Sequence, residues 1–355
     1  MGFGVAAIRI RKRLMELAAL LSLLIATQAQ AGAPAASLEV GMREVDWVDG
    51  ARPMVMTLFY PAEISDPAAK PTGLPFFVDL QFYRDAPVAS GNKRYPLVML
   101  SHGRGSNGLV YAWFAQYLAS RGYIVAALNH YRANTYESSI VYLTNKIWQR
   151  PLDIALDITW LLQDPDWGKH IDAGRIAIAG HSQGGFTSLW VGGAEVNPAL
   201  FTRYQRNWRN NLSIPQYLRE EMPVDAAPAL HLRDVRVKAA FAMAPGIVQA
   251  FGMDPQGLAK MAVPAYLIVG AADTQTPPAD NAAFAAKYIP KAELNIIPGR
   301  VDHEIFTNEC DQEGKDNFPE SCIDAPGVDR HALHEMIGAA AVNFFDRNLD
   351  LRRPQ

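Results

Sequence analysis

An apolar segment runs directly into a serine between glycines at Ile176-Ala177-Ile178-Ala179-Gly180-His181-Ser182-Gln183-Gly184-Gly185. The pattern G-x-S-x-G between a buried strand and a helix is typical of a nucleophile elbow. The turn is tight, so a side chain at Gly180 or Gly184 would collide with neighbouring backbone. The turn would hold the Ser182 hydroxyl above the sheet, with the Gln183 amide facing a developing oxyanion. The motif therefore predicts a nucleophilic serine at residue 182.

A serine hydroxyl needs a base to take its proton, and a carboxylate usually orients that base. In this architecture the chain order is serine, acid, histidine. Asp273 ends the apolar segment at residues 266–273, and His303 follows the apolar segment at residues 294–297. Both would lie on loops at the carboxyl ends of strands. We therefore expect a triad of Ser182, Asp273 and His303.

Other residues compete for these two roles. Asp302 adjoins His303 and would have to fold back, and Asp280 falls in the first turn of an expected helix, where a capping role suffices. His231 lies in a region without a clear strand. His331 and His334 share one face of the last expected helix, where packing or surface roles are usual.

The loop at residues 101–108 follows the first apolar strand of the parallel region and should supply the second oxyanion amide. We expect that amide to be Arg104, while His102 pins the loop by hydrogen bonding. The Arg104 side chain could contact an acidic substrate or be a solvated charge. His130 and Tyr131 end another expected strand, so we expect them to line the substrate pocket.

Apolar β-rich runs alternate with helical segments, which predicts a mostly parallel central sheet with helices on both faces. The first two runs, separated by Asp49-Gly50, indicate an N-terminal antiparallel hairpin, followed by a proline-rich connector at residues 61–87. The expected strands are residues 38–48, 54–60, 97–100, 124–128, 176–179, 239–242, 266–269 and 294–297. The expected helices are residues 110–121, 150–163, 186–193, 278–288 and 331–347.

The region at about residues 195–236 breaks this alternation, being rich in aromatic residues, Arg, Asn and Pro. An insertion between sheet strands is typical of a cap over the carboxyl edge, where α/β sheets bind ligands. A purely structural excursion is the alternative. We expect one α/β domain at residues 32–355 that carries this insertion.

Composition argues for a globular chain. The 355 residues include 33 Lys and Arg against 36 Asp and Glu, with 49% hydrophobic residues. A net charge of −3 offers no basic face for nucleic acid, so we expect no nucleic-acid partner. No H-E-x-x-H occurs, and residues 331–335 do not match it, so we expect no metal site.

Residues 1–31 have the pattern of a secretory signal peptide: basic residues up to Arg13, an apolar run at residues 14–26, and Ala29-Gln30-Ala31. An uncleaved anchor is the alternative, but the run is short and contains Glu16, whereas a spanning helix needs about 20 apolar residues. We expect cleavage after Ala31, export to the periplasm or outside the cell, and no stable membrane insertion afterwards.

Export bears on the two cysteines, because an oxidising compartment lets a disulfide persist. Cys310 and Cys322 bracket a polar segment containing Gly and Pro that would otherwise be a mobile loop. We expect them to pair, with two separate thiols as the alternative. The carboxylates between them do not have the spacing of a calcium-binding EF-hand loop.

These motifs together resemble the α/β-hydrolase superfamily, and within it the predicted dienelactone hydrolase and platelet-activating-factor acetylhydrolase-like branch. The resemblance covers about residues 40–348. It is carried by residues 100–103, 118–125 and 180–185 and by the loops of Asp273 and His303. It implies the α/β-hydrolase fold and ester hydrolysis without a cofactor. Dienelactone hydrolases carry a cysteine nucleophile where Ser182 stands here, and residues 195–236 match no named substrate pocket.

The sequence therefore predicts a serine-dependent carboxylic ester hydrolase that works through an acyl-enzyme. Its partner would be a small-molecule or lipid-like ester. An exported peptidase or amidase on the same fold is the alternative, followed by a binding protein without catalysis. Acyl size, leaving group and oligomeric state do not follow from these residues.

Overall fold

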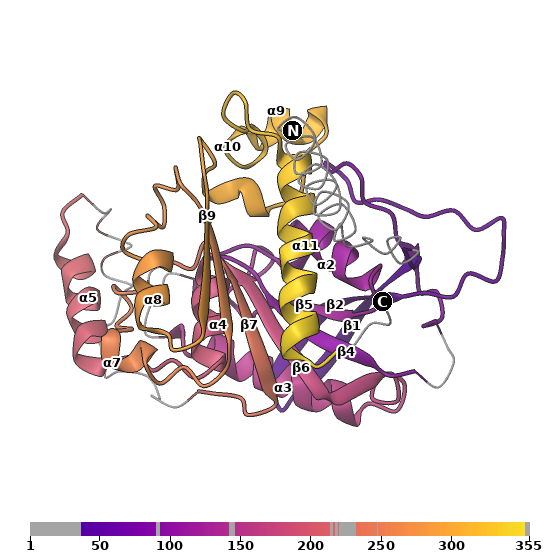
Figure 1. The fold of residues 1–355 in the computed structure, drawn as a ribbon, viewed down its shortest axis with the longest axis horizontal. Coiled ribbons are helices and arrows are strands. Elements are labelled where there is room, and N and C mark those ends of the chain that lie inside the picture. The colour runs from indigo at the N-terminus through magenta and orange to yellow at the C-terminus, as the bar shows by residue number, and fades with distance from the viewer. Residues whose placement is uncertain are drawn as a thin grey trace, which may run out of the picture. The chain divides into compact units, whose positions relative to one another are not determined.

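A computed structural model describes residues 37–89, 93–141, 146–213, 216, 219, 232–246 and 248–351. Its strands form a single sheet in the order β3-β1-β2-β5-β4-β6-β7-β8-β9 (Figure 1). The strands are β1 (Val40–Asp49), β2 (Arg52–Pro61), β3 (Tyr83–Arg84), β4 (Tyr95–Ser101), β5 (Ile124–Asn129), β6 (Ile171–His181), β7 (Val237–Met243), β8 (Ala265–Gly270) and β9 (Ala292–Ile297). The expected signal peptide lies outside the described residues.

The sheet has an antiparallel edge and a parallel body. β1 and β2 form an antiparallel hairpin, and β2 pairs antiparallel with β5. From β5 through β4, β6, β7 and β8 to β9 every pairing is parallel. The carboxyl ends of these six strands therefore share one edge, where α/β folds place their sites.

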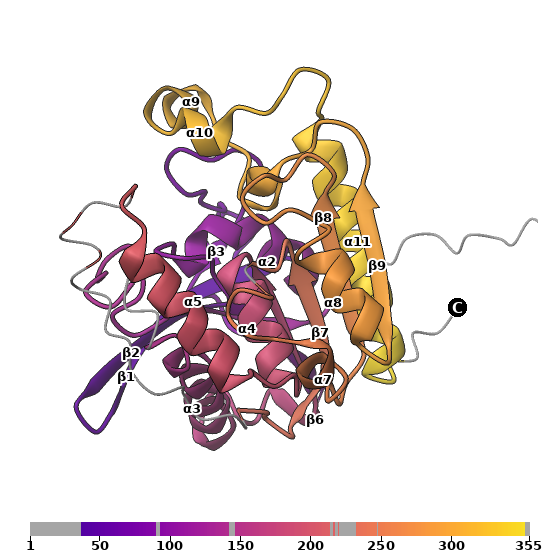
Figure 2. The same ribbon diagram turned by 90° about the vertical axis from the view of Figure 1, so that its left-hand side faces the viewer.

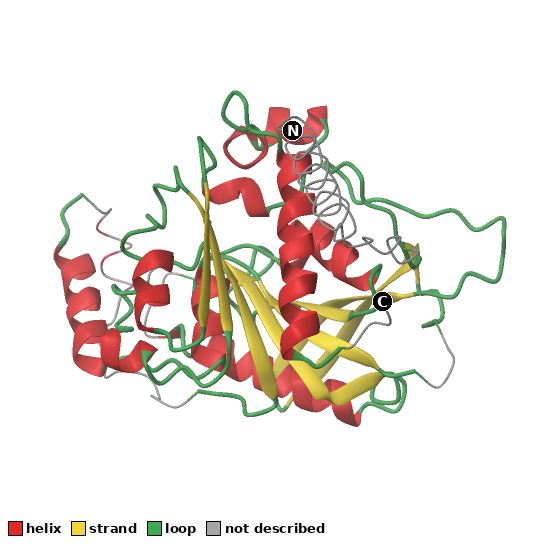
Figure 3. Ribbon diagram, in the orientation of Figure 1, coloured by secondary structure: helices red, strands yellow, loops and turns green. Residues whose placement is uncertain are grey.

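Helices cover both faces of the sheet, as Figures 2 and 3 show. α2 (Ala112–Ala119) and α11 (Arg330–Asn348) pack together on one face, and α3 (Gln149–Gln163) and α4 (Gln183–Val191) pack together on the other. The remaining helices are α5 (Pro198–Asn210), α7 (Pro255–Leu258), α8 (Ala282–Tyr288), α9 (Gln312–Asn317) and α10 (Pro319–Cys322), with 3₁₀ turns η1 (Gly108–Tyr111) and η3 (His303–Phe306). The predicted sheet, hairpin and helical layers are confirmed.

The core lies between these layers. Every residue of β4 is buried, which fits a central strand covered on both faces. Phe241 on β7 stacks on Tyr266 of β8 at a ring-centroid distance of 5.0 Å. It also contacts Phe114 of α2 and Phe345 of α11. This aromatic cluster fixes one helical layer to the strands that carry the site.

Three helices begin elsewhere than their patterns predicted. The expected helix at residues 110–121 is the 3₁₀ turn η1 followed by α2, and the Asn107 side chain caps η1. The helix expected at residues 186–193 begins at Gln183, because the chain passes from strand to helix through Ser182 alone. The helix expected at residues 278–288 begins only at Ala282, after a turn in which the Asp280 amide donates to Pro277 O.

Short elements appear where loops were expected. The proline-rich connector contains β3, which pairs with β1. The segment between the cysteines forms α9 and α10. In the region at residues 195–236, α5 is a helix, while most of residues 214–231, with His231, lie outside the described residues. Within the described part of the chain, no helix combines the length and apolar character needed to cross a membrane.

Candidate active site

Ser182 lies on the sharp connection between β6 and α4. Its backbone has φ 56° and ψ −120°, a conformation that a non-glycine residue adopts only under strain. Hydrogen bonds to the next strand and its loop hold it there: the Ser182 amide donates to Met243 O at 2.9 Å, and the Gly246 amide donates to Ser182 O at 3.0 Å. The side chain is half-buried. The turn thus presents the hydroxyl at the carboxyl edge of the sheet.

The two glycines of the motif are required by backbone contacts on each side. A Cβ added at Gly180 would lie 2.3 Å from Gly184 O, and one added at Gly184 would lie 1.9 Å from Ser101 O. Neither distance is possible without moving backbone. The predicted reason for small residues at this turn is therefore confirmed.

Asp273 and His303 form a buried pair. The Nδ1 atom of His303 lies 2.7 Å from Asp273 Oδ2, and both side chains are almost inaccessible. Thr276, three residues after the acid, donates its amide to Asp273 Oδ1 at 2.7 Å and its hydroxyl to Oδ2 at 2.8 Å. Burial alone would raise the pKa of Asp273, but the bond and charge of His303 and the two Thr276 bonds hold it below its usual value.

Ser182 and Thr276, the residue that binds Asp273, both lie close to Gly246 in the loop after β7. A Cβ added at Gly246 would lie 2.5 Å from Thr276 Cγ2 and 3.7 Å from Ser182 Oγ. His181, next to the serine, has its ring centroid 4.5 Å from that of His303, and its Nε2 lies 3.0 Å from His303 O. The structure thus brings the three predicted residues to neighbouring strand ends.

Of the competing acids, Asp302 caps η3 through the Glu304 amide, and Asp280 lies in the turn before α8.

The loop after β4 lies against Ser182. A Cβ added at Gly103 would be 3.5 Å from Ser182 Cβ, and the Gly103 amide donates to Tyr111 Oη at 3.1 Å. The His102 ring accepts the His130 amide at Nε2, so its proton is on Nδ1, which donates to Gly103 O at 2.6 Å. That bond polarises the peptide whose N–H belongs to Arg104, which strengthens the N–H as a donor.

His102 and His130 are both buried and neutral. Burial and the nearby Arg150 cation lower the pKa of each histidine well below its usual value. His130 was expected to line the substrate pocket, and this expectation is wrong. Its ring is fully inaccessible, with Nε2 2.8 Å from Ser101 Oγ and Nδ1 3.0 Å from Asp153 Oδ2. It supports the loop after β4 from beneath.

Tyr131 lines a narrow cavity next to the loop after β4. The same cavity is lined by Arg104 and Gln183, the residues whose amides the sequence singled out, and by Arg150 and Asp153 of α3. Asp153 also accepts hydrogen bonds from the Tyr131 amide at 3.2 Å and from Arg52 Nη2. This buried network was not predicted from the sequence. One signal was available: a basic residue in the first turn of a helix opposes the helix dipole, and Arg150 stands there.

A second, larger cleft of about 760 Å³ lies between α5 and α8. Gln275 and Pro277 of the acid loop border it on either side of Thr276. From α5 it is lined by Leu200, Arg203, Tyr204 and Asn207. Tyr204 packs edge-on against Phe251, at a centroid distance of 5.1 Å. The helix in the expected cap region therefore faces the acid loop across an open cleft.

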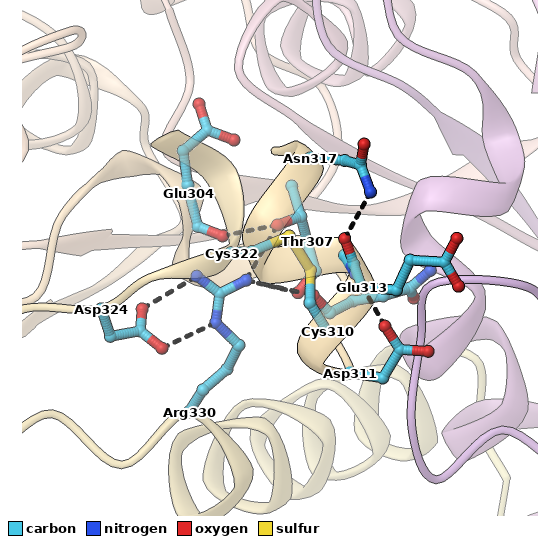
Figure 4. Close-up of a disulfide and its surroundings, with 11 residues drawn as sticks. Glu304, Thr307, Cys310, Asp311, Glu313, Asn317, Cys322, Asp324 and Arg330 are labelled. Carbon is cyan, nitrogen blue, oxygen red and sulfur yellow. Dashed lines mark hydrogen bonds and ion pairs between the residues drawn. A yellow bond between two sulfur atoms is a disulfide. The ribbon is translucent and has the colours of Figure 1, made fainter. Parts of the chain in front are cut away.

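Cys310 and Cys322 are bonded, with Cα atoms 5.5 Å apart, so the predicted disulfide is confirmed (Figure 4). Arg330 of α11 lies beside it. Its guanidinium binds both oxygens of Asp324, at 2.9 and 2.8 Å, and donates to Thr307 Oγ1 at 3.0 Å and Asn308 O at 3.1 Å. The disulfide and this arginine together anchor the chain that follows His303.

The last two histidines have the structural roles that their helix position favoured. His334 stacks on Trp113 with ring centroids 3.7 Å apart, and its Nε2 lies 2.9 Å from Ile305 O. His331 is exposed, with Nδ1 3.6 Å from Asp79 and 3.7 Å from Glu309.

Comparisons with known proteins agree with this architecture. Residues 77–150 match the family model of platelet-activating factor acetylhydrolase, isoform II, a segment that includes the loop after β4 and Arg150 but ends before Ser182. The acylamino-acid-releasing enzyme of Sus scrofa is 34% identical over 98 residues, which cover 26% of this chain and only 13% of that protein. A ferulic acid esterase from Streptomyces cinnamoneus superposes with a TM-score of 0.60 at 21% identity, covering 91% of this chain and 96% of that one. With its strand order, its helical layers and its serine turn, the chain has the α/β-hydrolase fold.

Proposed function

We propose that the protein is a serine hydrolase that cleaves carboxylic esters through an acyl-enzyme. Ser182 Oγ attacks the acyl carbon, and its proton passes to His303 Nε2. The tetrahedral intermediate carries its negative charge on the former carbonyl oxygen, which the amides of Arg104 and Gln183 bind. The alcohol leaves with the proton from His303. Water, deprotonated by the same nitrogen, then attacks the acyl-enzyme and releases the acid.

The observation that supports this proposal most directly is the buried Asp273–His303 pair at the same sheet edge as a serine in a strained turn. The carboxylate orients the imidazole by accepting its Nδ1–H, which leaves Nε2 to act as the base. The proposal requires the Ser182 hydroxyl to reach His303 Nε2 in the substrate complex.

The comparisons support an ester as the substrate. The matching family model describes an acetylhydrolase, and the similar fold belongs to an esterase. Both names refer to the hydrolysis of acyl groups. The open cleft between α5 and α8 is our candidate for the part of the ester that determines specificity, with α5 as part of a cap.

Amides are the second candidate substrates, since the Sus scrofa relative is named for release of acylamino acids. Rates on matched p-nitrophenyl esters and p-nitroanilides of the same acyl group separate the two leaving groups. We expect the ester to be preferred. Faster turnover of the anilide would assign the protein to the amidases.

Labelling and substitution test the nucleophile. A fluorophosphonate probe should modify Ser182 alone, and Ser182→Ala should lose at least about 10⁴-fold in kcat on p-nitrophenyl acetate. Ser138→Ala, at an exposed serine, is the matched control and should keep the wild-type rate. Full turnover by Ser182→Ala would refute the proposal.

Export is proposed with this activity, because the Cys310–Cys322 disulfide suits an oxidising compartment. N-terminal sequencing of the protein from a periplasmic or culture fraction should begin at Gly32. A mature chain that begins upstream of the apolar run would contradict cleavage after Ala31.

A further inference from the structure

Arg150 contacts the loop that carries the Arg104 amide. It lies in the first turn of α3 and is 2% exposed. Its Nη2 donates to the carbonyl oxygen of His102, two residues before Arg104, and lies 3.3 Å from Ser101 Oγ. The guanidinium therefore fixes the backbone at the point where β4 ends and the loop begins.

The same side chain reaches the helix that carries the Gln183 amide. Its Nε donates to Thr187 Oγ1 at 3.2 Å, and Thr187 Oγ1 in turn donates to Gln183 O at 2.9 Å. One planar cation thus connects the two segments whose amides we assign to the oxyanion. These contacts join residues separated by 37 to 49 positions in the chain.

The nearby carboxylate of Asp153 acts on the charge of Arg150 without binding it. Among the described residues no carboxylate forms an ion pair with it, because Asp153, one turn further along α3, binds Arg52 and His130 instead. Burial lowers the pKa of Arg150 to about 9, which still leaves it a cation at neutral pH. Arg150 lines the same narrow cavity as Arg104 and Gln183, so its field favours negative charge there.

We propose that Arg150 is a positioning residue of the esterase reaction, holding the Arg104 and Gln183 amides at the separation that the oxyanion requires. The inference rests on the proposed function. The positioning by Arg150 stabilises the transition state most, because the negative charge on the former carbonyl oxygen exists only there and in the tetrahedral intermediate. A merely structural arginine would affect unfolding and leave kcat unchanged.

Two substitutions separate the geometry from the charge. Arg150→Met removes both, and Arg150→Lys keeps a cation but cannot span three acceptors on two segments. On p-nitrophenyl acetate we expect kcat to fall about 100-fold for Arg150→Met and about 10-fold for Arg150→Lys, with KM changing less than about threefold. The control is Arg236→Met, which removes a guanidinium that also binds α3, at Ala155 O and Thr159 Oγ1. It should lower the Tm and keep kcat.

A second readout reports the oxyanion itself. The serine hydroxyl adds to a trifluoromethyl ketone to give a hemiketal with an anionic oxygen, so this inhibitor resembles the intermediate. Its inhibition constant should rise across the Arg150 variants in proportion to the loss of kcat/KM. A structural defect that removes a fraction of folded enzyme would leave the inhibition constant of the remainder unchanged.

If both Arg150 variants fail to fold, Thr187 decides the question. Thr187→Val removes the hydroxyl that links Arg150 to Gln183, and Thr187→Ser retains it. Thr187→Val should lose at least fivefold more kcat than Thr187→Ser, as expected for one lost hydrogen bond of about 1 kcal/mol. Equal rates for the two variants would overturn the inference.

Wild type and Ser182→Ala are assayed alongside. Inactive wild-type protein, or an active Ser182→Ala, would refute the proposed function and the role of Arg150 with it. Active wild type, inactive Ser182→Ala, and folded Arg150 variants with kcat within twofold of wild type would refute the role of Arg150 alone.

Discussion

His303 Nδ1 lies 2.7 Å from Asp273 Oδ2, and this contact joins the loop after β9 to the loop after β8. In Asp273→Asn the amide can present an N–H toward Nδ1, which would favour the tautomer with its proton on Nε2, the wrong one for a base. We expect kcat to fall about 10⁴-fold with little change in the Tm. Esterase kinetics on p-nitrophenyl acetate and a thermal melt measure both. A loss of less than tenfold would show that another carboxylate supports the base.

Thr276 also binds the Asp273 carboxylate, with its hydroxyl on the oxygen that His303 contacts. Thr276→Val removes the hydroxyl bond to Asp273 Oδ2 and keeps the backbone bond to Oδ1. The remaining contacts still orient the acid, so we expect kcat to fall about fivefold to tenfold, less than the full loss of a hydrogen bond to a charged group, about 1.5 to 3 kcal/mol, would give. Thr276→Ser, which retains the hydroxyl, should be closer to wild type. Equal rates for the two variants would contradict this role.

The parts of the site that could be predicted are those encoded locally. The serine turn consists of a strand, a tight glycine turn and a helix within ten residues, and each of these three parts has a recognisable residue pattern. Asp273 and His303 follow from the order of strands, because parallel strands bring their carboxyl ends to one edge. Cys310 and Cys322 are only 12 residues apart and had no other partner.

The parts that could not be predicted depend on side-chain direction and on distant contacts. His130 ends a strand at the correct edge, yet successive side chains of a strand point to opposite faces, so an offset of one residue places it beneath the loop. The contacts of Arg150 with Ser101, His102 and Thr187 cross three elements. No local pattern indicates them, apart from a cation at the wrong end of a helix.

Gly184 should tolerate no side chain. In Gly184→Ala the new methyl would meet Ser101 O at 1.9 Å, and either the start of α4 or the end of β4 would have to move. We expect at least about 3 kcal/mol of lost unfolding free energy and loss of turnover. Urea unfolding measures the first and ester hydrolysis the second. Gly299→Ala is the control, because nothing lies within 4 Å of a Cβ there, although its φ of 87° carries a smaller conformational cost.

The disulfide should matter more for stability than for chemistry. Cys310→Ser with Cys322→Ser opens a loop for which chain entropy predicts about 3 kcal/mol. The Arg330 contacts with Thr307 and Asn308 remain and still anchor the chain after His303, so kcat should stay within about threefold of wild type. In thermal melts the oxidised protein should have the highest Tm. The reduced protein should come next, and the double variant should have the same Tm as the reduced protein or a lower one. A collapse of kcat on reduction would show that the disulfide positions the base.

Asp153 should make the protein less stable as the pH rises. Burial raises the pKa of its carboxyl from 3.8 to about 7, despite the nearby Arg52 cation and the bond from the Tyr131 amide. Between these two values the folded state binds a proton that the unfolded state has released, so the unfolding free energy falls with increasing pH in that window. Asp153→Asn removes this titrating carboxyl and therefore its contribution to the pH dependence of the unfolding free energy.

The measurement for Asp153 is urea unfolding at pH 5 and pH 7.5. Relative to Asp153→Asn, the wild type should lose roughly 2 to 3 kcal/mol between these two pH values. Asp166→Asn, at an exposed carboxylate, is the control and should follow the wild type. A wild type that gains stability over this range relative to Asp153→Asn would show that the pairs with Arg52 and His130 outweigh burial. The carboxyl beneath the loop would then be ionised throughout, as a permanent counter-charge to Arg150.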